Sequence, residues 1–260
     1  MSTQTKIEWT EQTWNPTTGC SKISPGCTNC YAEIMARRLK AMGVPGYEKG
    51  FEVTLQPHRL NEPLKRKKPT VYFVNSMSDL FHEDIPDAYI KEVFDAMRNS
   101  PQHIFQVLTK RAERMAEFFK SYDAPENAWI GVTVENKEHG LPRLELLKSV
   151  KASVRFLSVE PLLEDLGKVD FGNIDWVIVG GESGNRARPM DKGWVLNIKE
   201  QCEKQNVPFF FKQWGTWGAD RVKRHKKKNG RLLQGETWDG MPQLVHPVSR
   251  SKSNGALAGL

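Results

Sequence analysis

The sequence lacks the features that place a protein in or beyond a membrane. No apolar run approaches the roughly 20 residues that a membrane-spanning helix needs, and the mean hydropathy of −0.56 is that of a water-soluble chain. Residues 1–11 contain charged side chains where a signal peptide would carry its apolar stretch. We therefore expect a cytoplasmic protein with no membrane partner.

Cysteine is also scarce, with four residues in a chain of 260. Cys20, Cys27 and Cys30 lie close together, whereas Cys202 stands far away in a helical pattern and is expected to be structural. This distribution excludes a disulfide framework. In a reducing compartment, a local cluster of three cysteines indicates metal binding or catalysis.

Acidic residues are in the minority, because 31 Asp and Glu stand against 38 Lys and Arg and give a formal net charge of +7. A basic balance favours an anionic partner such as a nucleic acid or a nucleotide. Residues 221–231 concentrate this charge in an expected exposed loop, which can meet either phosphates or only solvent. The polar residues at the end of the chain are expected to be disordered.

Short apolar runs alternate with amphipathic stretches from about residue 70 onward. The runs resemble strands buried on both faces and cover residues 70–75, 103–109, 129–134, 154–159, 176–179 and 208–212. Helical patterns cover residues 87–99, 111–121, 140–149 and 192–205. This alternation predicts an α/β fold with a parallel sheet, open or closed into a (β/α) barrel.

Two further elements are expected before this array. Residues 7–14 can form a first strand, and residues 31–42 form a helical pattern with an apolar stripe of Ile34, Met35, Leu39 and Met42. The three-cysteine segment lies between these two elements.

The cysteine segment allows three interpretations. Three thiolates can hold three irons of a [4Fe-4S] cluster and leave the fourth iron free to bind S-adenosylmethionine. Three cysteines and one histidine can instead bind zinc, with His58 or His82 as the fourth ligand. The cysteines can also be present without any metal. Spacing alone leaves all three interpretations open.

The motif NPTTGC…GCTNCYA resembles the cysteine loop of the spore photoproduct lyase branch of the radical S-adenosylmethionine enzymes. It departs from that loop by three extra residues between its first and second cysteines. VNSMSDLFHEDIP, FQVLTKRAERM and GVTVEN are similar to later segments of the same branch. From about residue 5 to residue 218, the chain also resembles uncharacterised bacteriophage-associated proteins with this three-cysteine loop.

This resemblance implies a radical S-adenosylmethionine enzyme with a partial or full parallel (β/α) barrel over residues 1–218. Residues 219–260 would form a basic C-terminal extension, partly disordered. Cys20, Cys27 and Cys30 would bind the [4Fe-4S] cluster, and an external one-electron donor would reduce it. We expect a nucleobase or nucleic acid as substrate, in repair or modification. The rival functions are a zinc-binding nucleic-acid adaptor without catalysis and an iron–sulfur protein that only transfers electrons.

Polar residues follow the predicted strands, and in parallel barrels functional side chains gather at these carboxyl ends. Lys110 can bind the carboxylate of S-adenosylmethionine, and three carboxylates, Asp79, Glu135 and Glu160, can bind its amino group or ribose hydroxyls. Glu182 lies in the Gly-rich segment 180–184, which can approach a nucleotide or simply make a tight connection. The same charged residues can alternatively form salt bridges along the rim.

Overall fold

Apolar strands build the centre of the molecule. The computed structural model describes residues 3–5 and 7–243. Its main sheet contains β1 (Thr3–Gln4), β2 (Gln12–Trp14), β5 (Val71–Val74), β6 (Ile104–Thr109), β7 (Ala128–Thr133), β8 (Arg155–Val159), β9 (Trp176–Gly180) and β10 (Phe209–Gln213), in that spatial order. The seven strands from β2 to β10 are parallel, and β1 lies antiparallel at one edge.

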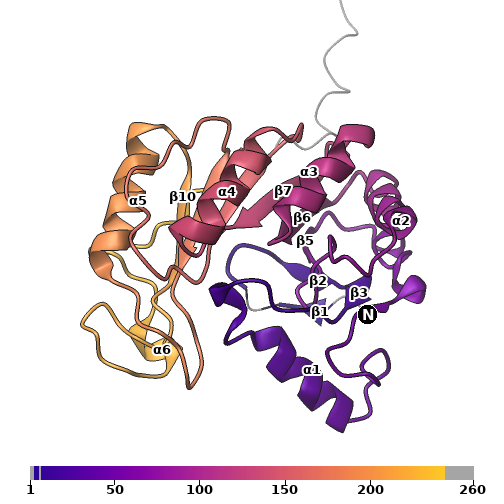
Figure 1. Ribbon diagram of the computed structural model, residues 1–260, viewed down its shortest axis with the longest axis horizontal. Coiled ribbons are helices and arrows are strands. Elements are labelled where there is room, and N and C mark those ends of the chain that lie inside the picture. The colour runs from indigo at the N-terminus through magenta and orange to yellow at the C-terminus, as the bar shows by residue number, and fades with distance from the viewer. Residues whose placement is uncertain (1–2, 6, 244–260) are drawn as a thin grey trace, which may run out of the picture.

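Helices cover the outer face of this sheet (Figure 1). They are α2 (Asp87–Arg98), α3 (Ala112–Ser121), α4 (Lys137–Lys148) and α5 (Lys192–Lys204). Their apolar faces and alternate strand residues, such as Phe105, Val107 and Val177, form the larger hydrophobic core. The result is a curled half-barrel, which confirms the α/β fold class predicted from strand and helix alternation.

The inner, concave face of the sheet is filled with aromatic side chains near the amino ends of the strands. Trp9, Trp129, Phe156, Trp176 and Phe210 pack there as a second core and are almost completely buried. Several of these rings meet edge to face, including Trp129 with Trp176 at a centroid distance of 6.0 Å. This aromatic layer closes the amino end of the half-barrel and leaves the carboxyl ends of the strands for the polar site.

Smaller elements lie around the main sheet. They are α1 (Tyr31–Ala41), α6 (Lys226–Asn229), a two-stranded sheet of β3 (Thr17–Thr18) and β4 (Thr54–Leu55), and the 3-10 helices η1 (Pro25–Cys27), η2 (Pro57–Arg59) and η3 (Pro63–Lys65). Figure 1 shows α1 and α6 at the same end of the molecule. No helix in the described part of the chain is long and apolar enough to cross a membrane.

Three of the expected elements differ from those in the structure. Of the strand predicted over residues 7–14, only Gln12–Trp14 is a strand. α4 begins at Lys137, earlier than the predicted residue 140, because the Asn136 side chain accepts a hydrogen bond from the His139 amide at 3.0 Å and caps the helix. Of the apolar stripe predicted on residues 31–42, only Leu39 packs against a core, the small cluster of Ala32, Ala36, Tyr47 and Met77. Ile34, Met35 and Met42 are exposed, and α1 instead buries Ala32 and Ala36.

The segment after β10 packs back onto the sheet. Leu233 is fully buried in the larger core, and Trp238 packs against that core. The Gly240 amide donates to the Phe209 carbonyl at 3.0 Å, and the Phe211 amide donates to the Trp238 carbonyl at 2.9 Å. The boundary predicted at residue 218 stays a prediction. The expected disorder at the end of the chain concerns residues 244–260, which lie outside the described residues.

Candidate metal and cofactor site

The cysteine loop, residues 20–30, lies over the carboxyl ends of the parallel strands. Gly19 introduces it with a φ of 82°, and a Cβ atom there would stand 2.0 Å from the Glu52 carbonyl oxygen, so only glycine fits. The Cys20 amide donates to the Phe51 carbonyl at 3.1 Å. Cys20, Cys27 and Cys30 are free thiols of intermediate burial. They are therefore available as ligands at the open end of the half-barrel.

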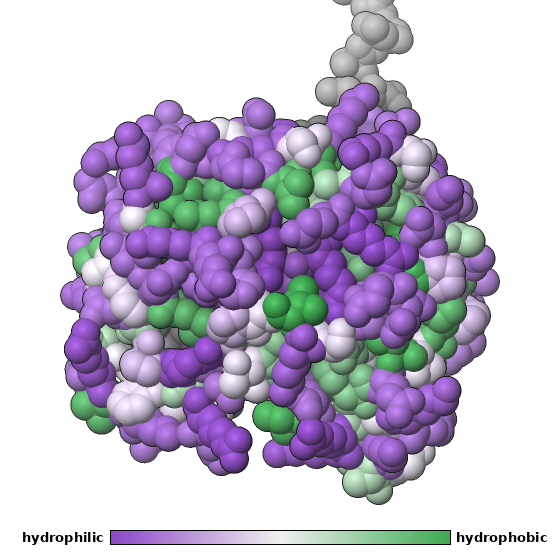
Figure 2. Space-filling view, in the orientation of Figure 1, coloured by the Kyte–Doolittle hydropathy of each residue, from purple (hydrophilic) through white to green (hydrophobic). Residues whose placement is uncertain are grey.

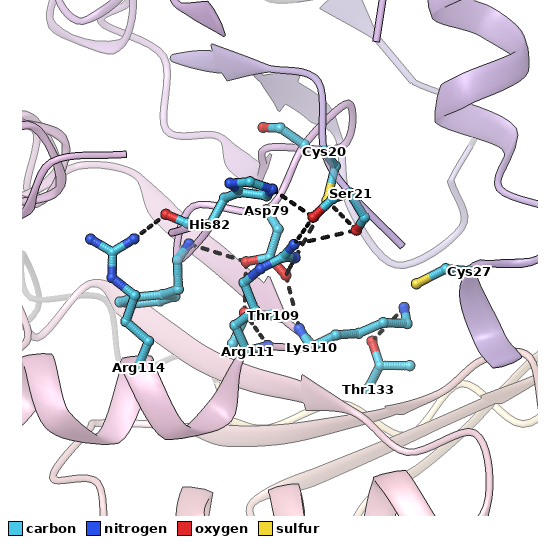
Figure 3. Close-up of polar contacts among 12 residues, drawn as sticks. Cys20, Ser21, Cys27, Asp79, His82, Thr109, Lys110, Arg111, Arg114 and Thr133 are labelled. Carbon is cyan, nitrogen blue, oxygen red and sulfur yellow. Dashed lines mark hydrogen bonds and ion pairs between the residues drawn. The ribbon is translucent and has the colours of Figure 1, made fainter. Parts of the chain in front are cut away.

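The first part of the loop is held by Arg111 and Asp79 (Figure 3). Arg111 Nη1 lies 3.4 Å from Cys20 Sγ and 3.4 Å from Asp79 Oδ2, and Nη2 donates to Ser21 Oγ at 2.7 Å. Asp79 Oδ1 accepts from Thr109 Oγ1 at 2.6 Å, and Oδ2 accepts from the Lys110 amide at 3.0 Å. Asp79 thus connects the carboxyl end of β6 to Cys20.

The middle of the loop rests on Glu135, which follows β7. The Ser24 hydroxyl donates to Glu135 Oε1, and Arg143 Nη1 donates to Glu135 Oε2 at 2.7 Å. A Cβ atom on Gly26 would stand 3.1 Å from the Glu135 carboxyl carbon, so this part of the loop packs directly on the carboxylate. Glu135 is completely buried and the Arg143 side chain is 5% exposed. The ion pair is therefore a fixed support under the loop.

The last part of the loop is held by Glu182, which follows β9. Asn29 Nδ2 donates to Glu182 Oε2 at 3.1 Å, and Arg188 forms two side-chain hydrogen bonds to the same carboxylate, at 2.6 and 3.0 Å. Arg188 Nη2 also donates to the Pro25 carbonyl at 3.0 Å. Glu135 and Glu182 therefore bond the loop directly, whereas Asp79 supports its first part through Arg111.

Two further predicted residues line the inner rim. Lys110 is partly buried, and its Nζ donates to Thr133 Oγ1 at 3.2 Å. Glu160 pairs with Lys212 at 2.7 Å, and both side chains are mostly buried. All five polar residues predicted as cofactor contacts thus lie at the carboxyl ends of strands. In the structure each of them has a protein partner, and their contact with a cofactor stays a prediction.

The electrostatics of the loop follow from burial and from these pairs. Burial raises the pKa of the Cys20 thiol to about 11, the charge of Asp79 adds to the rise, and Arg111 opposes it. Burial also works against ionisation of Glu135, but Lys110, Ser24 and Arg143 together lower the pKa of its carboxyl group. Glu182 behaves in the same way, with Arg188 as the main opposing partner. Glu135 and Glu182 are therefore carboxylates at neutral pH.

The cysteine loop carries as many thiols as a cluster with one open corner requires. Three unpaired thiols on one loop match the three cysteine ligands that leave a cubane iron free. Among residues 3–5 and 7–243, no group of three or more His, Cys, Asp and Glu side chains is arranged to hold a metal ion. The ligand role of the cysteines stays a prediction.

Comparison with known families identifies the chain. A family model described as "Protein of unknown function (DUF5131)" matches residues 4–242, which is most of the chain. The chain belongs to the DUF5131 family. No curated protein matches it. The bacteriophage association expected from the cysteine loop stays a prediction.

The DUF5131 chain is also similar to solved structures of spore photoproduct lyase. One is the lyase complexed with dinucleoside spore photoproduct, with a TM-score of 0.43 and 11% identity. Another is a mutant with bound AdoMet and dinucleoside spore photoproduct, with a TM-score of 0.45 and 12% identity. Each match covers 78% of this chain and 64% of the lyase chain. The DUF5131 chain thus spans less than two thirds of the length of these lyases.

The sequence leaves Arg188 open to an anionic substrate or to solvent, and the other residues that bond the supports of the DUF5131 site were missed by sequence reasoning. Arg111, Arg143 and Arg188 hold the three carboxylates, and Ser24 and Asn29 connect two of these to the loop. The only local signal was position, because Arg111 directly follows Lys110 and Asn29 lies between two of the cysteines.

The longer spacing between Cys20 and Cys27 has a structural use, since this spacer carries the contacts of Ser21, Ser24 and Pro25.

Proposed function

We propose that the protein binds a [4Fe-4S] cluster through Cys20, Cys27 and Cys30 and cleaves S-adenosylmethionine reductively, as a radical enzyme. The observation that carries this proposal is a loop of three free thiols held by strand-end carboxylates over the open end of a parallel half-barrel. The resemblance of the loop motif to that of the spore photoproduct lyase branch supports it. An external one-electron donor would supply the reducing electron.

Each part of the site has a task in this proposal. When bound, a cluster with S-adenosylmethionine on its free iron supplies the electron that breaks a carbon–sulfur bond of the sulfonium. Lys110 would bind the carboxylate of S-adenosylmethionine from the inner rim, and the Glu160–Lys212 pair offers polar partners to its other groups. The aromatic layer is a buried core below the site, and it would limit the access of water to a reactive radical from that side.

We further propose a nucleic acid or nucleotide as the substrate. The net charge of +7 favours an anionic partner. Lys226, Lys227 and Lys228 form α6 and are exposed. The segment before α6 reaches the site, because Lys223 Nζ donates to the Asn185 carbonyl at 2.7 Å and Trp217 Nε1 donates to the Ala187 carbonyl at 2.7 Å. The hydropathy surface shows hydrophilic side chains over much of this end of the molecule (Figure 2).

Anaerobic reconstitution tests the cofactor. Purified protein supplied with iron and sulfide should bind about four of each per chain, as a cubane requires. Cys27→Ala should lose the intact cluster, whereas Cys202→Ala should keep it because this thiol is part of α5 and lies in the core. Reduction in the presence of S-adenosylmethionine should then release 5′-deoxyadenosine. A reduced cluster that yields none supports the electron-transfer alternative, and a colourless protein with one zinc supports the adaptor.

Binding of a fluorescent single-stranded oligonucleotide at several salt concentrations tests the substrate class. Replacing Lys226, Lys227 and Lys228 by Gln should weaken binding and reduce the slope of log affinity against log salt by about 0.7 for each lost phosphate contact. The matched control replaces Lys120, Lys151 and Lys204, three exposed lysines outside α6. Equal effects of the two triple variants would contradict a role for α6.

A further inference from the structure

The guanidinium group of Arg111 is bonded through all three of its nitrogens. Nε donates to Glu83 Oε2 at 3.0 Å, and Nη2 donates to Ser21 Oγ at 2.7 Å. Nη1 faces both Asp79 Oδ2 and Cys20 Sγ, each at 3.4 Å. A side chain with this many partners has one orientation, and that orientation directs an N–H group at the first cysteine sulfur (Figure 3).

The backbone fixes the position of this side chain as well. The Arg111 amide donates to Thr109 Oγ1 at 2.9 Å, and the same hydroxyl donates to Asp79 Oδ1. Arg111 immediately precedes α3, so the chain direction at this point is set by the end of β6 and the start of a helix. The Arg111 side chain is only 8% exposed. Little water therefore weakens its interaction with Cys20.

We infer that Arg111 is a positioning residue that orients the Cys20 thiolate and raises the reduction potential of the cluster. This inference rests on the proposed function, because it requires Cys20 to be a cluster ligand. Hydrogen bonds to the sulfurs and the net charge around a cluster both set its potential. Reduction adds one negative charge, so a buried cation that donates to a ligand sulfur stabilises the reduced state more than the oxidised state.

Two further contacts to loop sulfurs are of a different kind. Cys20 Sγ lies 3.4 Å from the Ser21 carbonyl oxygen, which is a neutral acceptor. Ser24 Oγ lies 3.8 Å from Cys27 Sγ, and it is a neutral hydroxyl whose partner at closer range is Glu135. A charge-assisted hydrogen bond contributes more than a neutral one. We therefore expect the influence of the loop surroundings on the potential to come mainly through Cys20 and Arg111.

The experiment is an anaerobic redox titration of reconstituted full-length protein, followed by electron paramagnetic resonance. In Arg111→Gln the one-electron reduction equilibrium constant should fall by roughly tenfold, which corresponds to about 59 mV for a one-electron couple. Arg111→Lys keeps the charge but not the planar group, and should give a smaller shift in the same direction. Iron content, measured first, should stay near that of the unmodified protein.

The matched control is Arg37→Gln. Arg37 lines the same surface pocket as Cys20, but it is 74% exposed and its guanidinium pairs with Glu33 on α1. This control should leave the potential unchanged. An equal shift of the potential in Arg37→Gln would show that any lost positive charge near the cluster has this effect, and would overturn the inference. Unchanged potentials in both Arg111 variants would also overturn it.

A further variant keeps the inference testable if the Arg111 variants bind no cluster. Ser21→Ala retains the arginine and every cysteine but removes the 2.7 Å partner of Nη2, so it should lower the potential slightly. An unchanged potential in Ser21→Ala would then contradict the inference. Unmodified protein that binds no cluster would instead refute the proposed function itself, and this inference with it.

Discussion

At the scale of single residues, the site depends on carboxylates that hold the loop. Asp79, Glu135 and Glu182 are each nearly buried, and each is bonded to an arginine. Burying a charged group is costly unless it is paired and hydrogen-bonded, so each acid requires its arginine. The carboxylates of Glu135 and Glu182 also accept hydrogen bonds from the cysteine loop, and Asp79 bonds the arginine that donates to Ser21, so the loop has defined supports before any metal is bound.

Replacing Glu135 by Gln tests this dependence. The substitution keeps the shape of the side chain but leaves Arg143 as a buried cation without its carboxylate partner. Breaking a buried pair in this way costs about 3–5 kcal/mol of unfolding free energy. Urea denaturation of the metal-free protein measures it. Glu138→Gln is the control, because that side chain is 82% exposed and should change stability by less than about 0.5 kcal/mol.

The buried thiol of Cys202 should make the free energy of unfolding depend on pH, and this residue lies outside the site. Burial raises the pKa of its thiol to about 12 from the ordinary value of 9.0, so the folded state holds this proton more tightly than the unfolded state. The stabilisation that the protonated Cys202 thiol gives to the folded state is complete below about pH 9 and is lost as pH rises toward 12. At pH 10 the unfolded thiol has already ionised, and about 1.4 kcal/mol is lost.

Urea denaturation at pH 8 and pH 10 measures this effect in the unmodified protein and in Cys202→Ala. The variant loses stability at both pH values because of the cavity that it creates, but it should show a smaller decrease between them. Parallel pH profiles for the two proteins would contradict the raised pKa.

At the scale of elements, the strands and α1 both carry apolar residues at regular spacing but differ in how far these residues are buried. The strands alternate between two buried faces, one packed on helices and one on the aromatic layer. α1 carries apolar residues at helical spacing as well, yet Ile34, Met35 and Met42 face solvent. Periodicity therefore identified the helix but not the face that it buries, since burial depends on what lies beside the helix.

A substitution at Gly131 in β7 tests how tightly the inner face of the sheet is packed. A Cβ atom there would stand 2.6 Å from the ring of Phe156 in β8, so the glycine makes room for that ring. Gly131→Ala should therefore cost about 1–3 kcal/mol through overpacking. Phe156→Leu in the same chain removes the clash, and the double variant should be more stable than the sum of the two single effects. Additive effects in denaturant titrations would argue against this contact.

At the scale of the whole molecule, the segment after β10 is part of the packed structure. Leu233 is completely buried in the main core, whereas its neighbour Leu232 is 56% exposed. The segment also bonds to β10 through Trp238 and Gly240. The half-barrel and this segment thus share one hydrophobic core.

The neighbouring leucines give a matched pair of variants. Leu233→Ala should lower the unfolding free energy by about 2–5 kcal/mol, because it creates a cavity in the shared core. Leu232→Ala removes the same atoms from an exposed position and should change stability by less than about 0.5 kcal/mol. Urea denaturation followed by tryptophan fluorescence compares them. Equal effects would show that the segment does not share the core.

The sequence by itself determined the fold class and the place of the polar site. Buried strands alternating with helices can form only a few parallel arrangements, and the carboxyl ends of such strands must share one edge. The position of Cys20, Cys27 and Cys30 on a loop before this array was likewise readable from spacing and from turn-forming residues.

Only the tertiary structure decided how these parts meet. Arg111 and Cys20 are separated by 91 positions, and Ser24 and Glu135 by 111, so no local pattern connects them. Pairing of this kind depends on strand order and on the path of a loop across several strands. Three of the four carboxylates predicted as cofactor contacts, Asp79, Glu135 and Glu182, therefore emerged as supports of the cysteine loop, because their partners come from distant parts of the chain.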